Sequence, residues 1–331
     1  MTTSPWQWQP RQPAYARLAA AVIRLEGSGS RRFLHGQTSA AIDLAQPGQW
    51  ISSCCISPTG RMRALVEVLV DQAGAWLVIG AGDGAQVHQA LDRVLFPADQ
   101  VRLGAPQPAW WLLPVAAAGE TLQPAESGAP EARSWQALGQ NGGWQLGSGP
   151  LGQGLVLPDA AALPPAWASR QPLSAGEQEH WRLQQGLPAA PGEVNDDHNP
   201  FELGLAPRVS LSKGCYVGQE TLAKLATYDG VKQQLRRWHW AHTAAEQAPQ
   251  LGQELRAAGG EGRLGRISSL LELADGDRIG LALVRRQGLE LAQLQAGSWE
   301  QQQAEPAPAT LALSLPAQFV APPVGAGGVQ A

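Results

Sequence analysis

The sequence predicts an α+β protein in which a mixed α/β region is followed by a small antiparallel β-barrel. Candidate strands at 50–56 and 62–70 flank the turn 57–60, and helical segments alternate with strands through the first two thirds of the chain. From Trp238 the pattern changes to short apolar segments separated by glycines. That pattern is typical of a small closed barrel.

The other elements of the mixed region follow from local signals. Ser174 and Glu177 match a helix capping box, and Ser28 is a candidate helix cap. The predicted elements are strands at 20–27, 75–80, 101–103 and 110–115, and helices at 28–37, 84–95 and 174–185. The predicted barrel strands are 252–255, 262–269, 278–284 and 311–315.

Composition divides the chain into four parts. They are an irregular lead-in (1–16), a main region (17–237) that includes a variable subdomain at about 105–170, the barrel (238–315) and a tail (316–331). The variable subdomain is rich in Gly, Pro, Ala and Glu, and the tail repeats Pro, Gly and Ala, which predicts disorder.

Composition also limits the class of protein. The chain has 331 residues, 44% of them hydrophobic and 16% charged, and a net charge of −4, which does not indicate a general nucleic-acid binder. We find no membrane span and no secretory signal in the sequence. Three cysteines, two of them adjacent, form no disulfide framework. We therefore expect a cytoplasmic protein that is not in a membrane.

The segment 213–220 (Lys-Gly-Cys-Tyr-Val-Gly-Gln-Glu) is the strongest candidate site. All three lysines of the chain, Lys213, Lys224 and Lys232, lie within twenty positions. Cys215 lies between two glycines and shortly before a predicted helix, and Lys213 and the helix start would both favour its thiolate form. The alternative is a structural cysteine in a glycine-rich turn. The sequence leaves both interpretations open.

Local charge supports a ligand site near this segment. Residues 193–202 carry four acids and no Lys or Arg, whereas residues 208–237 carry six basic residues against two acids. The basic segment is either a solvated face or a site for an anionic ligand. Adjacent Cys54 and Cys55 would point to opposite faces of a strand, so we expect core residues there.

Metal chemistry has little support in the sequence. The pair His239 and His242 has metal-ligand spacing but lacks other candidate ligands nearby. Three thiols are also fewer than the roughly four that a stably bound iron–sulfur cluster needs, unless two copies of the chain form a dimer. We predict no metal site.

The motif Lys-Gly-Cys-Tyr-x-Gly-Gln-Glu at 213–220 resembles the signature of the YgfZ family of folate-binding proteins. These are relatives of the glycine-cleavage T-protein, an aminomethyltransferase. The resemblance extends over roughly 22–315. It includes the Pro-x-Glu-x-x-Leu element at 200–205, a helix–Gly–x–Pro segment at 181–188 and Gly-x-Ile-Ser-Ser at 265–269.

This resemblance implies a multi-domain ring around a channel for tetrahydrofolate or a one-carbon derivative, with Cys215 exposed beside it. It also implies a role in assembling or repairing iron–sulfur clusters, including those of enzymes that modify tRNA. The expected partners are such client enzymes or cluster-assembly proteins. Lys213 would activate the thiol or hold the folate tail. The candidate folate contacts are Trp181, Glu202, Tyr216, Gly218 and Gln219.

The alternative function is aminomethyl transfer, as in the T-protein. That enzyme class uses an aspartate on the hairpin after its Asn-x-x-Gly turn, whereas residues 57–63 here contain arginines and no acid. Gln184 and Gln185 likewise provide no carboxylate where the T-protein has a folate-contacting glutamate. We therefore rank this function second. Direct tRNA binding ranks third, because it needs a larger basic surface.

Overall fold

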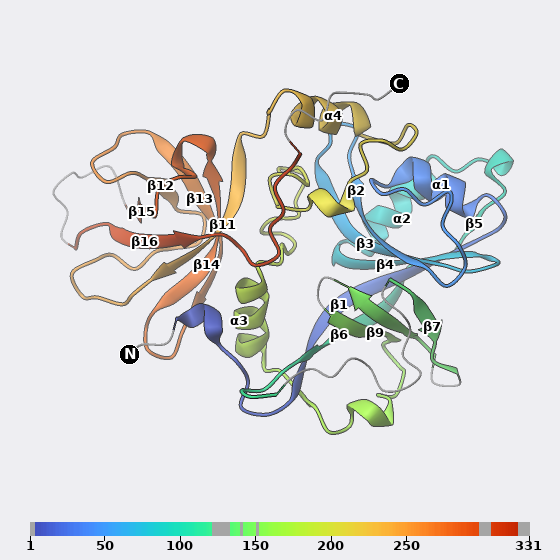
Figure 1. Ribbon diagram of the computed structural model, residues 1–331, viewed down its shortest axis with the longest axis horizontal. Helices are drawn as coiled ribbons and strands as arrows, with labels where there is room; N and C mark the ends of the chain where they lie inside the picture. The colour runs from blue at the N-terminus through green and yellow to red at the C-terminus, as the bar shows by residue number, and fades with distance from the viewer. Residues whose placement is uncertain (1–3, 121–132, 140–141, 150–151, 298–305, 324–331) are drawn as a thin grey trace.

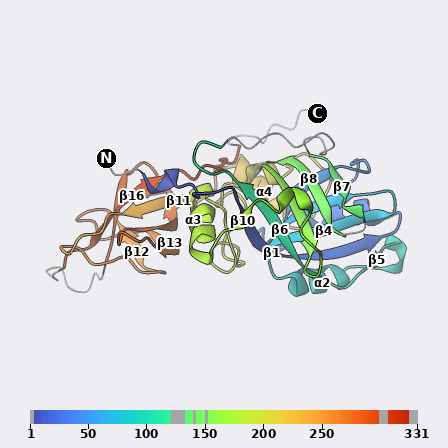
Figure 2. The ribbon, with the colours of Figure 1, turned by 90° about the horizontal axis from the view of Figure 1, so that it is seen from below.

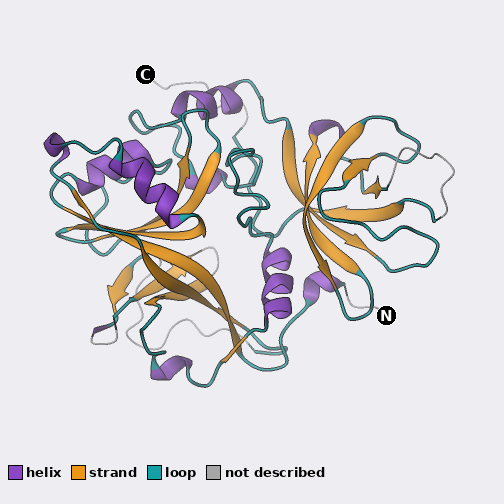
Figure 3. Cartoon of the chain, turned by 180° about the vertical axis from the view of Figure 1, so that it is seen from behind, coloured by secondary structure: helices purple, strands orange, loops and turns teal. Residues whose placement is uncertain are grey.

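The computed structural model describes residues 4–120, 133–139, 142–149, 152–297 and 306–323. A sheet region and a barrel lie at opposite ends of the molecule (Figure 1). The helix α3 (Ala175–Gln185) and the loop after it lie between these two parts, which is also clear from behind (Figure 3). This architecture confirms the predicted α+β class with a C-terminal antiparallel barrel.

One twisted sheet forms the larger part of the described chain. Its strands are β1 (Ala14–Glu26), β2 (Trp50–Ile56), β3 (Met62–Val70), β4 (Gly74–Gly82), β5 (Arg102–Leu103), β6 (Gln107–Val115), β7 (Trp135–Ala137), β8 (Trp144–Gly149), β9 (Gly152–Pro158) and β10 (Gln171–Pro172). The main order is β2-β3-β4-β1-β6-β9-β8-β7. The long strand β1 pairs with both β4 and β6, so it joins the two halves of the sheet.

The barrel closes in the order β11-β14-β13-β12-β15-β16. Its strands are β11 (Gln233–Trp240), β12 (Glu254–Arg256), β13 (Arg263–Glu272), β14 (Arg278–Arg285), β15 (Gln293–Ala296) and β16 (Ala309–Ser314). Trp238 and Trp240 are fully buried in its core. A Cβ at Gly280 would meet the Trp238 ring at 2.7 Å, so only glycine leaves room for this packing.

The helices are α1 (Ser30–Gln37), α2 (Gly84–Asp92), α3 and α4 (Gln219–Thr227), with 3₁₀ turns at Pro5–Gln7, Pro97–Asp99, Pro165–Trp167, Ala206–Arg208 and Arg286–Gly288. The predicted capping box of α3 is confirmed, and the helix ends at Gly186 in the left-handed region. The serine cap predicted for α1 is wrong, because Gly29 takes that position without a side-chain bond. None of the helices in the described ranges is long and apolar enough to span a membrane.

Three boundaries differ from the sequence expectation. The barrel begins with β11 at Gln233, before the expected boundary at 238. Residues 107–158, expected to belong to a variable subdomain, supply β6 to β9 of the main sheet. The strand β1 already begins at Ala14, inside the expected lead-in, because its alanine-rich first half pairs with β6. Pairing with distant strands thus extends strands for which the local β-propensity of the sequence is low.

The expected disordered tail also differs in its first part. The N–H of Val320 donates to the carbonyl of Gly204 at 2.9 Å, and Phe319 packs against the apolar cluster beneath it. Arg236 lies over the Phe319 ring, 5.5 Å from its centre. Residues 316–323 therefore return from the barrel to the region between the two parts, and the rest of the predicted tail (324–331) lies outside the described residues. The view from below shows the barrel and the sheet region side by side, with α3 between them (Figure 2).

Candidate functional site

The segment 213–220 is held between the end of α1 and the turn that joins β2 to β3. The N–H of Val217 donates to the carbonyl of Gly36 at 3.0 Å. Gly218 begins α4 with φ +78°, and a Cβ there would lie 2.6 Å from the carbonyl oxygen of Ser57. Glycine is required here both for its positive φ and for this close approach. The loop that carries Cys215 is therefore fixed on both sides.

The three thiols lie in different surroundings. Cys215 is exposed, whereas Cys54 and Cys55 are buried on β2. Burial raises the pKa of Cys54 to about 11 and that of Cys55 to about 12, so both stay protonated near neutral pH. The two adjacent cysteines are core residues, as their strand position predicts. Cys215 is the thiol that reagents and partners can reach.

Lys213 points inward, toward the end of α1. Its ammonium donates to the carbonyls of His35, Thr38 (2.6 Å) and Ala40 (2.7 Å), and it lies 4.3 Å from the centre of the Tyr216 ring. Burial lowers the pKa of Lys213 to about 7. Because these three carbonyls occupy the three N–H donors of the ammonium, none remains for a thiolate or a folate carboxylate. The geometry favours a structural clamp over either role expected from the sequence.

The other expected contacts of this segment are also internal. The Tyr216 hydroxyl donates to the carbonyl of Ser210 at 3.0 Å, and the Gln219 amide donates to the carbonyl of Lys213 at 3.0 Å. Trp181 is buried in the core between α3 and the sheet. These side chains close the loop and fill the core, and they line none of the described pockets.

Two adjoining pockets lie between the sheet region and the barrel. The first, here called the barrel pocket, has a volume of about 770 Å³ and is lined by α3, the loop 189–198 and β13. The second, the basic pocket, has a volume of about 660 Å³ and is lined by Arg61, Asp197, Glu202, Asp229–Gln233 and Arg285–Gln287. Asp197 and Gln233 line both pockets, which makes them neighbours. Both volumes fall within the usual range for small-molecule sites, about 300–1,000 Å³.

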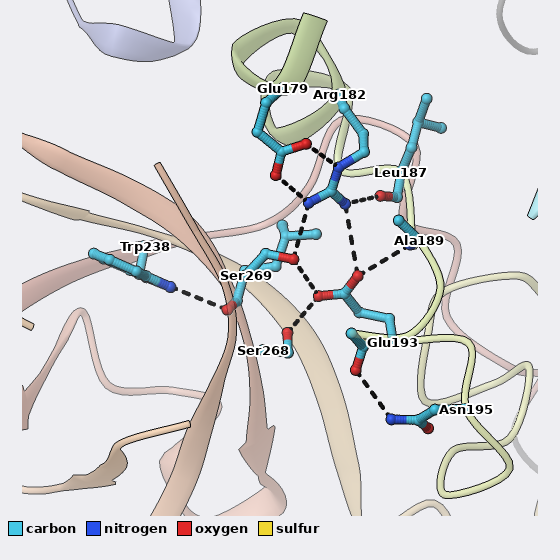
Figure 4. Close-up of polar contacts among 11 residues, drawn as sticks. Glu179, Arg182, Leu187, Ala189, Glu193, Asn195, Trp238, Ser268 and Ser269 are labelled. Atoms are coloured by element: carbon cyan, nitrogen blue, oxygen red, sulfur yellow. Dashed lines mark hydrogen bonds and ion pairs between the residues drawn. The ribbon is translucent and has the colours of Figure 1, made fainter. Parts of the chain in front are cut away.

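A buried network forms one wall of the barrel pocket (Figure 4). The Glu193 carboxylate accepts hydrogen bonds from the hydroxyls of Ser268 (2.6 Å) and Ser269 (2.7 Å) and from the N–H of Ala189. Arg182 binds Glu179 through two nitrogens and lies 3.6 Å from Glu193. Because Glu193 is fully buried and well paired, it holds α3 and its loop against β13 and is not free to bind a ligand.

Glu202 lies in the basic pocket, where opposing influences act on the pKa of its carboxyl group. Burial raises the pKa of its carboxyl group, whereas the N–H of Asn199 (2.9 Å) and the charge of Arg61 (3.6 Å) oppose that shift. Lys232 and Gln233 also favour its ionised form. Of the five folate contacts expected from the sequence, Glu202 is the one that lines a described pocket. The arrangement can accept N–H donors from a ligand and pair with an anionic group.

Sequence reasoning missed most residues of these pockets. Arg182, Glu193 and Ser268 come from three separate segments, and no local motif links them. The available signals were the excess of acids over 193–202 and the excess of bases over 208–237, because both segments line the pockets. Arg61, which occupies the hairpin in place of an acid, lies in the basic pocket.

The two spaced histidines of the barrel share one acid. His239 lies 2.7 Å from one carboxylate oxygen of Asp277, and the backbone N–H of His242 donates to the other at 2.8 Å. Within the described ranges, no three His, Cys, Asp or Glu side chains are grouped so that they could hold a metal ion. The pair therefore braces two neighbouring strands.

Comparison with known proteins identifies the fold. The chain superposes on aminomethyltransferase T of the glycine cleavage system from Bartonella henselae with a TM-score of 0.73 and 16% identity, covering 96% of this chain and 90% of that one. It is also 27% identical over 230 residues to a chloroplastic Arabidopsis thaliana protein that is provisionally named a transferase (At1g60990). That match covers 64% of this chain and about half (52%) of the relative. No protein-family profile matches the chain. The protein thus has the fold of aminomethyltransferase T.

Proposed function

We propose that this protein binds a reduced folate and uses it, with Cys215, to support iron–sulfur enzymes, as members of the YgfZ family do. The observation that carries the proposal is the pair of adjoining pockets between the sheet and the barrel, with Glu202 in one of them. Its fold, that of an aminomethyltransferase, is compatible with a folate site. The cytoplasmic location expected from the sequence remains part of the proposal.

The residues of the two pockets suit tetrahydrofolate or a one-carbon derivative. A pterin ring presents N–H donors, which a carboxylate such as that of Glu202 accepts. The ligand also carries carboxylates, which need cations, and Arg266 and Lys232 lie at the two pockets. When bound, the folate would supply one-carbon chemistry, and the protein would supply orientation and the thiol.

Fluorescence titration with tetrahydrofolate and with its methylene form tests the folate part. We expect saturable binding to the wild type, at least tenfold weaker binding to Glu202→Gln, and unchanged binding to Lys224→Gln. Lys224 is a suitable control because it lies on the exposed face of α4, paired with Glu220 at 2.7 Å. Absence of saturable binding by either folate would overturn the proposal.

The role of Cys215 needs a separate test. In cells that lack the protein, the wild type should restore the activity of an iron–sulfur enzyme that modifies tRNA, whereas Cys215→Ala should not. Cys54→Ala is the matched control, because that thiol is buried. Full restoration by Cys215→Ala would remove the thiol from the proposed function while leaving folate binding intact.

Aminomethyl transfer is the second candidate, favoured by the similarity to aminomethyltransferase T. Against it, residues 57–63 provide no acid, and Arg61 extends from this hairpin to the carbonyl of Asp197. A carboxylate there would orient the folate amine, and a guanidinium cannot accept its proton. We therefore expect no turnover with a lipoyl-bound aminomethyl substrate. Turnover well above background would reverse the ranking.

A further inference from the structure

The basic pocket contains cations with different degrees of pairing. Arg61 lies 3.6 Å from Glu202, and Arg286 binds the carboxylate of Asp229 at 2.7 Å. Arg285 uses one guanidinium nitrogen on the carbonyl of Arg263 at 3.2 Å. Two of the four cations, Arg61 and Arg286, thus form an ion pair within 4.0 Å.

Lys232 differs from these arginines. Within the described residues, its ammonium forms no hydrogen bond and no ion pair within 4.0 Å, although its charge favours the ionised form of Glu202 and its own carbonyl accepts the N–H of Arg286 at 2.9 Å. Gln233 pairs with Arg285 across the strands β11 and β14, which brings Lys232 next to Arg285 and Arg286. Like charges at the ends of adjacent strands repel one another. A bound anion would offset this repulsion between the positive charges.

We propose that Lys232 and Arg285 form a carboxylate-binding site in the basic pocket. The carboxylate belongs either to the glutamate tail of a folate that spans the two adjoining pockets, or to a free acidic amino acid. The first source rests on the folate function proposed above, and the second does not. Asp197 and Gln233, which line both pockets, mark where a single ligand would cross from one pocket to the other.

This site replaces Lys213 as the anchor for a folate tail. The Lys213 ammonium is buried and its donors are used by three carbonyls, whereas the Lys232 side chain is exposed at the mouth of a pocket. A flexible ammonium suits a carboxylate at the end of a mobile tail, because it can bind from several directions. Replacing Lys232 with a neutral residue should weaken binding of the folate tail and leave binding of the pterin ring unchanged.

The test compares four ligands by calorimetry at fixed low salt: tetrahydrofolate, its triglutamate form, tetrahydropterin without a tail, and free glutamate. Lys232→Gln should weaken tetrahydrofolate about tenfold and the triglutamate form more strongly, with no effect on tetrahydropterin. Arg285→Gln should act in the same direction. Lys224→Gln, which removes the same charge outside the pocket, is the matched control.

The outcomes separate this proposal from the folate function. Glutamate binding that depends on Lys232, without binding of either folate, would support the site and refute the folate function. Folate binding that Lys232→Gln and Arg285→Gln leave unchanged would refute the site and keep the folate function. If no carboxylate ligand depends on Lys232 more than on Lys224, the site is refuted.

Discussion

Two glycines of the segment 213–220 should respond very differently to alanine. Gly218 has φ +78°, and its Cβ would meet the Ser57 carbonyl oxygen at 2.6 Å and the Cδ1 of Ile56 at 2.8 Å. Gly214 has no positive φ, and the nearest atom to its Cβ would be the ring nitrogen of His35 at 3.8 Å. The two positions therefore form an internal pair of variant and control within one loop.

The expected cost of Gly218→Ala has two parts. The left-handed conformation costs a residue with a Cβ about 1–2 kcal/mol. Contact with a backbone carbonyl, which cannot rotate away, adds about 1–3 kcal/mol of overpacking. The total, about 2–5 kcal/mol, should lower the melting temperature by roughly 4–10 °C. Gly214→Ala should change the stability by less than about 1 kcal/mol, because its conformation accepts a side chain.

Thermal and urea unfolding followed by circular dichroism measure this difference. The rate of alkylation of Cys215 gives a second readout, because Gly218→Ala should also displace the loop that holds this thiol. If the two variants melt at the same temperature, Gly218 is not confined between α4 and the β2–β3 turn as described. Destabilisation by Gly214→Ala alone would likewise contradict the geometry.

Three further predictions concern a thiol, an ion pair and a buried acid. Alkylation near neutral pH should modify Cys215 first, because burial raises the pKa of Cys54 to about 11; peptide mapping that finds Cys54 modified faster would contradict this. Arg208→Met should lower the unfolding free energy by about 3–5 kcal/mol, because it leaves Glu67 buried without the ion-pair partner that lies 2.8 Å away. In urea unfolding, a second change, Glu67→Leu, should recover most of that loss. Burial raises the pKa of Glu202 above the unfolded value of 4.5, so its contribution to stability is present below pH 4.5 and is lost as the pH rises through the folded pKa. Glu202→Gln should flatten that part of the stability profile, and an unchanged profile would refute the assignment.

Much of the fold could be predicted because its signals are local. The strand pair β2–β3 and the helix α3 follow from short-range patterns: a turn with glycine, and a capping box over four residues. The barrel likewise follows from apolar segments separated by glycines. The exposure of Cys215 could also be predicted from a local signal, because a glycine on either side favours an exposed loop.

The roles of charged residues depended on tertiary structure. The carbonyls that bind Lys213 come from residues 35–40, more than 170 positions earlier in the chain, so no local pattern could show that its ammonium points inward. For the same reason the sequence could not distinguish Lys213 from Lys232, although both belong to one basic segment. The first lysine is buried among carbonyls, and the second lies at a pocket built from four separate segments.

The sequence by itself determined the strand pair 50–70, the helix at 174–185, the buried pair of cysteines and the segment that presents a thiol. Each of these depends on contacts within a strand, a turn or a helix end. Only the tertiary structure decided where the pockets lie and which cations form ion pairs there. Those properties depend on the burial and pairing of side chains from distant segments. Glu193 pairs with Ser268 of the barrel, and Arg61 of the β2–β3 turn pairs with Glu202, more than 140 positions later in the chain.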